Sequence, residues 1–418
     1  MRISREGGAV LCLAVLSMAS NLALAVHGTA FDFLDEQTYM GAALQLVHGQ
    51  SCTIVALPFS TPCNYEHPPL VKVLEALSYY IFGWAAPGQA VGSVYEVPLG
   101  SIAQILASFL SFRFFQIVMG ALSVGLVYLI ALGVSGNRKL ALFSSALLLL
   151  DPLFAFFSRT AYLDVPMVFF ALCAYAVYFR AYRLGPLNQY WVSGSLLALS
   201  FLSKETGLIF VPPLIVYHLL FRGAAWKVRL SEALELIASC IIVIAAGLQL
   251  FDTLARAPFP TFLDNLSYMV SFSQSISCGV HCYANFLPGP WYLFLTSIYW
   301  MVDLSNNPVL LGLILLWIPF GAWALLRRGK KVGPEDRLFA LAALLFFTTF
   351  TANLIIYLGG RIVWIWYLLP LIPALSLGGG YLLTRKEIPR FARVAIFVAV
   401  VAGYLWAYTV GPNLLIYD

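Results

Sequence analysis

The sequence predicts an all-α polytopic membrane protein, and three observations support that fold class. Apolar residues make up 61% of the 418 residues and charged residues only 10%, and the mean hydropathy is +0.86. Long apolar runs recur along the chain, with basic residues gathered in the short segments between them. A soluble globular protein carries about a quarter charged residues, so a large soluble enzyme is excluded. The net charge of +5 reflects membrane topology rather than nucleic-acid binding.

Eleven stretches are long and apolar enough to be spanning helices, because each span needs about 20 mainly apolar residues. In chain order they are 8–27, 111–133, 138–156, 163–181, 188–203, 206–221, 234–251, 308–326, 338–358, 362–383 and 391–410.

Two further runs need separate interpretations. The apolar run 71–84 follows Pro68-Pro69 and is interrupted by Lys72 and Glu75, which favours a helix lying on or dipping into the membrane interface. The first span could instead be a secretory signal peptide with Ala23-Leu24-Ala25 at its cleavage site. We favour a span, because the apolar region of a signal peptide is usually about 7–15 residues long.

The distribution of charge predicts how the chain is threaded. With the N-terminus inside the cell, 18 of the 24 Lys and Arg residues fall in inside segments, as the positive-inside rule requires. Most of the acidic residues then fall outside, together with two long loops, 28–110 and 252–307. We therefore expect one transmembrane domain over residues 1–418 with its working site on the outer face.

Four cysteines lie in these two outer loops. Cys52 and Cys63 bracket part of the first loop, and Cys278 and Cys282 lie in the second. Two local disulfides are plausible in an oxidising exterior, and four free thiols are the alternative. Cys278, His281 and Cys282 could also bind a metal, but this spacing alone is a weak zinc signal, so we favour disulfides.

Several charges at the outer helix ends need an explanation, since a charge near the membrane is costly unless it is paired or wetted. One interpretation is local: Arg159 pairs with Asp164, Lys204 pairs with Glu205, and the remaining cations reach the lipid headgroups. The other interpretation is a common site around Asp35 and Glu36. In it, the cations hold a phosphate and a carboxylate acts as a base; these cations are Arg113, Arg159, Lys204 and Arg361. We favour the common site, because residues from separate parts of the chain share one depth.

Such a site suits a sugar carried on a lipid phosphate. The phosphate leaves as a stable anion, so the enzyme needs only a carboxylate to deprotonate a hydroxyl and a few cations to stabilise the leaving group. The sequence contains no P-loop and no Gly-rich dinucleotide fingerprint, in agreement with a site that binds no nucleotide.

Motifs in the first outer loop and further along the chain resemble those of a known family. The segment Phe31-Asp32-Phe33-Leu34-Asp35-Glu36, followed by His67-Pro68-Pro69-Leu70-x-Lys72, resembles the first luminal loop of the dolichyl-phosphate-mannose–protein mannosyltransferases, which are GT-C glycosyltransferases. Similar segments follow in family order: Arg113 with Gly120-Ala121-Leu122, Ser158-Arg159-x-x-x-Leu163-Asp164, Ser203-Lys204-x-x-Gly207, Pro290-Trp291, Asn307-Pro308 and Arg361…Tyr367-Leu368-Leu369-Pro370. Glu205 stands where the family usually has Trp.

The resemblance implies a GT-C fold with eleven spans and interfacial helices in the first outer loop. It implies catalytic roles for Asp35, as the base, and for Glu36. Donor binding falls to Arg113, Arg159, Lys204 and Arg361, and Glu66, His67 and Asp164 shape the site. It also implies inversion at the sugar without a required metal, although a divalent metal is not excluded. No β-trefoil MIR domain interrupts the second outer loop, which indicates a prokaryotic form.

The expected function is transfer of mannose, or a related hexose, from a polyprenyl or dolichyl phosphate to Ser or Thr hydroxyls. The acceptors would be secreted or membrane proteins at the outer face of the cell membrane, or of the endoplasmic reticulum membrane in a eukaryote. The alternative within the same fold is transfer to a lipid or glycan. A transporter or flippase is disfavoured, because the charges lie at helix ends rather than at the midplane and no repeat is visible.

Overall fold

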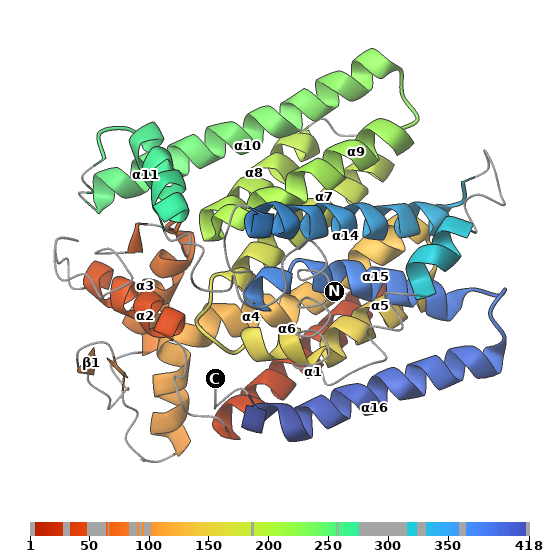
Figure 1. Cartoon of the computed structure of the whole chain (residues 1–418), viewed down its shortest axis with the longest axis horizontal. Coiled ribbons are helices and arrows are strands. Elements are labelled where there is room, and N and C mark those ends of the chain that lie inside the picture. Colours follow the sequence, from red (N-terminus) through yellow and green to blue (C-terminus); the bar gives the residue numbers. More distant parts are fainter. Residues whose placement is uncertain are drawn as a thin grey trace.

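Helices account for nearly all of the described chain (Figure 1). The computed structural model describes residues 5–27, 34–47, 64–65, 67–82, 90–91, 94–95, 102–184, 188–255, 257, 259–275, 316–323, 332–358 and 365–414. The helices that begin before residue 200 are α1 (Arg5–His27), α2 (Leu34–Val47), α3 (Leu70–Phe82), α4 (Ile102–Ser135), α5 (Arg138–Leu150), α6 (Pro152–Phe157), α7 (Asp164–Leu184) and α8 (Asn188–Ser203). A two-stranded antiparallel pair, β1 (Ala90–Val91) and β2 (Val94–Tyr95), lies between α3 and α4.

The rest of the described chain continues the helical pattern. The 3-10 helix η3 (Glu205–Phe210) runs into α9 (Val211–Phe221), and a second short 3-10 helix, η4 (Ile365–Leu368), precedes α15. Residues 316–323 are also helical. The remaining helices are α10 (Trp226–Leu254), α11 (Phe262–Ser275), α14 (Pro334–Leu358), α15 (Leu371–Thr384) and α16 (Arg390–Leu414).

The predicted all-α membrane fold is confirmed. Three described helices are long and apolar enough to cross a membrane by length and composition: Leu110–Ser135, Trp226–Leu254 and Pro334–Ile356. Shorter apolar helices cover Gly7–Leu22, Glu205–Phe221 and Leu371–Thr384. Each of the eleven predicted stretches contains helix in the residues that the structure describes. The number of spans remains a prediction.

Two predicted helices are interrupted where proline removes a backbone donor. The predicted span 138–156 breaks after Leu150, where the Asp151 side chain accepts a hydrogen bond of 2.8 Å from the backbone of Phe154 and so begins α6. The predicted span 206–221 starts as the 3-10 turn of η3 and becomes α-helical only at Val211, just before Pro212-Pro213. Gly207 is needed in this turn, because a Cβ there would lie 2.5 Å from the backbone of Ser200.

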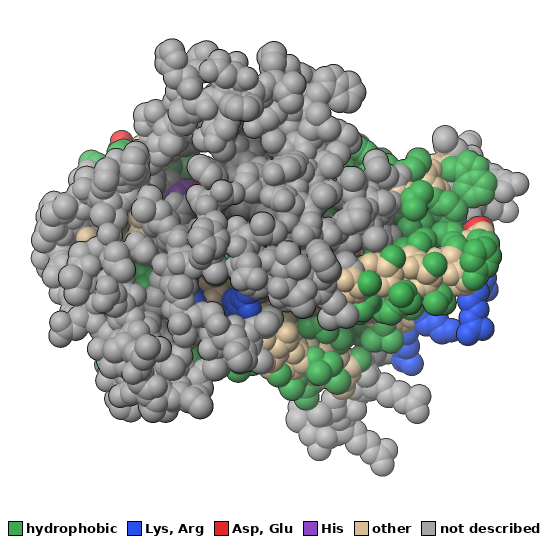
Figure 2. Space-filling model, turned by 60° about the horizontal axis from the view of Figure 1, so that its bottom comes forward, with side chains coloured by type: hydrophobic (Ala, Val, Ile, Leu, Met, Phe, Trp, Pro, Cys, Tyr) green, Lys and Arg blue, Asp and Glu red, His purple; other side chains and the backbone are tan. Residues whose placement is uncertain are grey.

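The long helix α4 lies at the centre of the bundle. It packs against α1, α3, α5 and α7, while α8 packs between α7 and α10 and α15 packs against α5 and α14. Figure 1 shows α2, α3 and α11 together at one end of the bundle, away from the turn between α15 and α16. In Figure 2, the described side chains toward the other end are mainly hydrophobic, with Lys and Arg gathered at its tip. This arrangement agrees with the predicted basic inner end, although the orientation in the membrane remains a prediction.

Candidate active site

A buried ion pair anchors the first turn of α2. The Arg113 guanidinium of α4 donates two parallel hydrogen bonds to the Glu36 carboxylate, of 2.7 and 2.8 Å, and the backbone N–H of Ala161 donates a third of 2.6 Å. The side chains of Arg113 and Glu36 are only 3% and 1% exposed. Arg113 therefore does not extend to the lipid headgroups. The pair joins α2, α4 and the turn between α6 and α7, and so fixes the backbone of α2 next to Asp35.

Asp35 itself lies in the first turn of α2, one residue before Glu36. Its side chain falls outside the part that the structure describes, so its role as base remains a prediction. A residue in the first turn of a helix lies near the positive end of the helix dipole, which stabilises a carboxylate.

A second buried ion pair joins α7 to η3. The Lys204 ammonium donates hydrogen bonds of 2.8 and 2.9 Å to the two oxygens of Asp164, and both side chains are 1% exposed. The same ammonium lies 4.8 Å from the centre of the Tyr367 ring. The local interpretation, in which Lys204 pairs with Glu205, is therefore wrong: the partner is 40 residues away in the sequence.

The third pair, His67 with Glu205, is the most open of the three. The distance from His67 Nδ1 to Glu205 Oε2 is 2.9 Å, and the two side chains are 22% and 33% exposed. Burial raises the pKa of Glu205, but the nearby charges of His67 and Lys204 and the His67 hydrogen bond outweigh it and lower the pKa to about 2. Glu205 is thus a carboxylate at physiological pH.

The turn before α3 is held by Lys72. Its ammonium is fully buried and donates to the backbone carbonyls of Asn64 and His67, the latter at 2.7 Å. The helix α3 begins at Leu70, directly after Pro68-Pro69, as the sequence predicts. This arrangement fixes the position of His67 relative to η3.

The polarity of α3 is the reverse of that of a helix in water. Lys72, Glu75 and Ser78 face the protein and are buried, whereas the outward residues are apolar: Val73, Leu77, Tyr80 and Ile81. Of the two charges that interrupt the apolar run in the sequence, Lys72 binds the turn before α3 and Glu75 binds Gln116 of α4. The outward face is suited to contact with lipid.

Glu75 is a buried carboxyl group close to the Glu36–Arg113 pair. It accepts a hydrogen bond of 2.8 Å from the side-chain amide of Gln116, and its other oxygen has no partner within the described part of the chain. Burial, together with the charge of Glu36, raises the pKa of Glu75 well above its usual value. The folded protein therefore holds a proton on Glu75 at pH values where the unfolded chain has lost it.

Replacing Glu75 with Gln is expected to reduce the pH dependence of stability. Folding raises the pKa of Glu75. Its contribution to the stability of the fold is therefore fully present below the pKa of Glu75 in the unfolded chain, and it is lost as pH rises through the pKa of Glu75 in the folded protein. The stability of Glu75→Gln minus that of the parent should therefore be greater at pH 8 than at pH 5. Thermal unfolding in detergent measures both stabilities. Glu235→Gln on α10 is the control, and an equal response in both variants would contradict the assignment.

The other predicted site residues divide into two groups. Arg159 lies in the turn after α6, is partly exposed, and has its guanidinium 5.6 Å from the centre of the Phe156 ring. Predictions on Glu66 and Arg361, and on the disulfides of Cys52, Cys63, Cys278 and Cys282, concern residues outside the described ranges. Among the described residues, no group of three or more His, Cys, Asp or Glu side chains could hold a metal ion.

Sequence reasoning missed three members of this network. Gln116 contacts Glu75, Tyr367 contacts Lys204, and the backbone of Ala161 contacts Glu36. The available signal for α3 was the three-residue spacing of Lys72 and Glu75, which places both on one helix face. No comparable signal in the sequence predicts a backbone donor such as Ala161.

Comparison with known proteins finds relatives over part of the chain. Residues 64–254 match the family model of the dolichyl-phosphate-mannose-protein mannosyltransferases. A curated relative, dolichyl-phosphate-mannose–protein mannosyltransferase 1 of Saccharomyces cerevisiae, is 32% identical over 194 residues, which cover 45% of this chain and 21% of the relative. The chain thus aligns with about a fifth of that relative's length. The matched region includes His67, Arg113, Asp164, Lys204 and Glu205 but begins after Asp35 and Glu36.

Two solved structures share the fold over nearly the whole chain. ArnT from Cupriavidus metallidurans, bound to undecaprenyl phosphate, is 18% identical with a TM-score of 0.59, over 94% of this chain and 63% of that one. The Archaeoglobus fulgidus oligosaccharyltransferase in its apo form is 14% identical with a TM-score of 0.58, over 98% of this chain and 56% of that one. The chain therefore shares the fold of these two structures. Over residues 64–254 the chain is similar to the protein O-mannosyltransferase family.

Proposed function

We propose that the protein transfers mannose, or a related hexose, from a polyprenyl phosphate to Ser or Thr hydroxyls of proteins at the outer face of the membrane. Asp35 acts as the base that accepts the hydroxyl proton while the oxygen attacks the sugar. The observation that carries this proposal is the buried Glu36–Arg113 pair, which fixes the turn of α2 that holds Asp35. A base must be held in place to act, since small displacements cost large factors in rate.

The four predicted cations divide into two pairs with different roles. Arg113 and Lys204 are buried and bound to carboxylates, so we assign them to holding Glu36 and Asp164 in place. Arg159 is partly exposed, and we assign to it and to Arg361 the direct contact with the phosphate. Guanidinium groups bind phosphate through paired hydrogen bonds, which suits this role.

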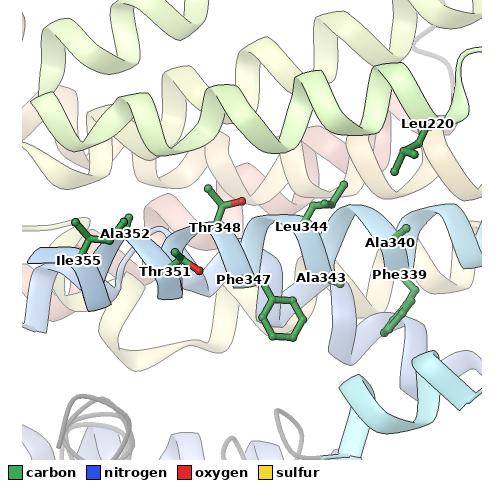
Figure 3. Close-up of a pocket in the computed structure, with 10 residues that line it drawn as sticks. All are labelled: Leu220, Phe339, Ala340, Ala343, Leu344, Phe347, Thr348, Thr351, Ala352 and Ile355. Carbon is green, nitrogen blue, oxygen red and sulfur yellow. The ribbon is translucent and has the colours of Figure 1, made fainter. Parts of the chain in front are cut away.

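The lipid tail of the donor fits an apolar groove between α9 and α14 (Figure 3). The groove has a volume of about 580 Å³ and is lined by Leu220, Phe339, Ala340, Ala343, Leu344, Phe347, Thr348, Thr351, Ala352 and Ile355. From Phe339 to Ile355 the helix rises roughly 24 Å, close to the thickness of the hydrocarbon layer. Near its outer end, Asn353 donates to the carbonyl of Tyr367, whose ring contacts Lys204. The end of α14 that carries Ala352 and Ile355 therefore lies next to the segment that contacts Lys204.

Filling the groove is expected to weaken the use of long-chain donors. Thr348 points from α14 toward α9 (Figure 3), so Thr348→Phe would narrow the groove. We expect KM for a long polyprenyl donor to rise about tenfold, the effect of roughly 1.4 kcal/mol, with kcat little changed. A short-chain donor should be unaffected. Ile241→Phe on the exposed face of α10 is the control, and equal effects of the two changes would contradict the assignment.

The nature of the acceptor needs its own experiment. Purified protein in liposomes is incubated with radiolabelled polyprenyl-phosphate mannose and with either a Ser/Thr-containing peptide or a lipid or glycan acceptor. Labelled peptide is the expected product. Label in the lipid or glycan alone would favour the alternative acceptor class, to which the fold is equally suited.

The remaining proposals concern placement and cofactors. We place the site on the extracellular face of the cell membrane with a cytoplasmic N-terminus, or on the lumenal face of the endoplasmic reticulum in a eukaryote, because the basic segments lie on the other face. We expect transfer without a metal, with secreted or membrane proteins as acceptors and no nucleic-acid partner. Retained activity in the presence of a chelator would support the metal-independent mechanism.

A further inference from the structure

The three ion pairs of the site differ in their access to a ligand. Glu36–Arg113 and Asp164–Lys204 are at most 3% exposed, so neither can release a proton to an incoming molecule without rearrangement. His67 and Glu205 are 22% and 33% exposed. The His67–Glu205 pair is thus the accessible acid–base pair among these three. It combines two residues 138 positions apart in the sequence.

The geometry leaves one nitrogen of His67 available. Nδ1 lies 2.9 Å from the Glu205 carboxylate and is the donor in this contact, because a carboxylate at physiological pH can only accept. Nε2 has no hydrogen-bond partner among the described residues. The backbone of His67 is held by Lys72 and its ring lies edge-on to Tyr39, with 5.8 Å between ring centres. The imidazole is therefore oriented with Nε2 ready to contact a ligand.

We propose that His67 is a further catalytic residue that donates the Nε2 proton to the phosphate as it leaves the sugar, with Glu205 as its positioning residue. This inference rests on the proposed function. The acceptor oxygen bonds to the sugar C1 while the C1–O bond to phosphate breaks and leaves its electron pair on the phosphate. The hydroxyl proton goes to Asp35 and the Nε2 proton goes to the phosphate. Water then returns a proton to His67 and takes one from Asp35.

The chemistry of both partners matches this step. A phosphate monoester binds its second proton with a pKa near 6, whereas the donor diester cannot bind one in this range. Imidazole exchanges protons near neutral pH, and proton transfer is most efficient between groups of similar strength. The leaving phosphate is therefore a suitable acceptor for an imidazolium proton.

The charged groups around His67 fix the orientation of its ring. Within the described chain, the charged or titratable groups around His67 come from four elements. They are Glu205 of η3 with Lys204 just before it, Asp164 of α7, Lys72 of α3 and Tyr39 of α2. Lys204 is neutralised by Asp164, and Lys72 binds backbone carbonyls. Glu205 is then the charge in direct contact with the ring, where its carboxylate holds the Nδ1 proton and leaves Nε2 facing away from it.

The test compares His67→Gln and Glu205→Gln with the parent protein in liposomes, from about pH 5 to about pH 9. The parent is expected to lose kcat as pH rises above neutral, because the acid loses its proton. His67→Gln should lower kcat about 100-fold near the optimum and abolish this alkaline limb, with little change in KM. Glu205→Gln should lower kcat less than His67→Gln does, because the imidazole keeps its proton donor but loses the carboxylate that orients it. Glu235→Gln should leave the profile unchanged.

A binding experiment separates this inference from the proposed function. Undecaprenyl phosphate is titrated into each variant in lipid nanodiscs at several pH values. The parent should bind it more tightly as pH falls through neutrality, and His67→Gln should lose this dependence whether or not sugar transfer is observed. An unchanged pH dependence of binding in His67→Gln would overturn the inference while leaving the transfer function intact. Loss of the acidic rather than the alkaline limb of kcat would also overturn it, because His67 would then act as a base.

Discussion

Replacing Glu36 with Ala is expected to destabilise the protein by about 3–5 kcal/mol, because the Arg113 charge would remain buried without its partner. The carboxylate accepts three hydrogen bonds and joins three segments of the chain, so its loss removes more than one contact. The measurement is the free energy of unfolding in detergent, obtained from denaturant titrations monitored by tryptophan fluorescence.

A double variant tests whether the cost comes from the unpaired charge. Glu36→Met combined with Arg113→Met removes both charges and should recover most of the stability that Glu36→Ala loses, since a buried ion pair contributes little over an apolar pair. The double variant should nevertheless remain inactive, because the turn that holds Asp35 would no longer be fixed. A loss below about 1 kcal/mol in the single variant would show that the pair is not buried as described.

Asp35→Asn is expected to lower the rate of sugar transfer by about 100- to 10,000-fold while leaving donor binding within a few-fold of the parent. The amide has nearly the shape of the carboxylate but cannot accept the hydroxyl proton. Transfer is measured with labelled polyprenyl-phosphate mannose, and binding is measured separately with the same lipid. Asp264→Asn on α11, an exposed carboxylate outside the site, is the control.

Much of the fold could be predicted from the sequence because apolar length and charge distribution are local signals. The predicted span 188–203 has the bounds of α8. The sequence also contains a local signal for the break at Asp151-Pro152, because an N-cap residue is followed there by proline. The prediction did not use this signal, since apolar residues continue on both sides of it. The number of spans remains a prediction, since length and composition identify only some of the described helices as spans.

The site was predicted as a set of charges but not as a set of pairs. Arg113 and Lys204 were singled out as charges that need an explanation, and His67 as a residue that shapes the site. Their partners lie 77, 40 and 138 positions away, respectively. Pairing over such separations depends on helix packing, which a single sequence does not encode in its local pattern. Glu205 illustrates this, because the sequence shows only its departure from the family's Trp, whereas the structure shows its contact with His67.

The most direct test of the central claim is a transfer assay with purified parent protein and Asp35→Asn, using radiolabelled polyprenyl-phosphate mannose and a Ser/Thr peptide in liposomes. The account predicts labelled peptide and free polyprenyl phosphate in equal amounts from the parent, and a bound but unreacted donor with Asp35→Asn. Transfer by Asp35→Asn at the parental rate would contradict it, and so would a parent protein that binds the donor but transfers its sugar to no acceptor.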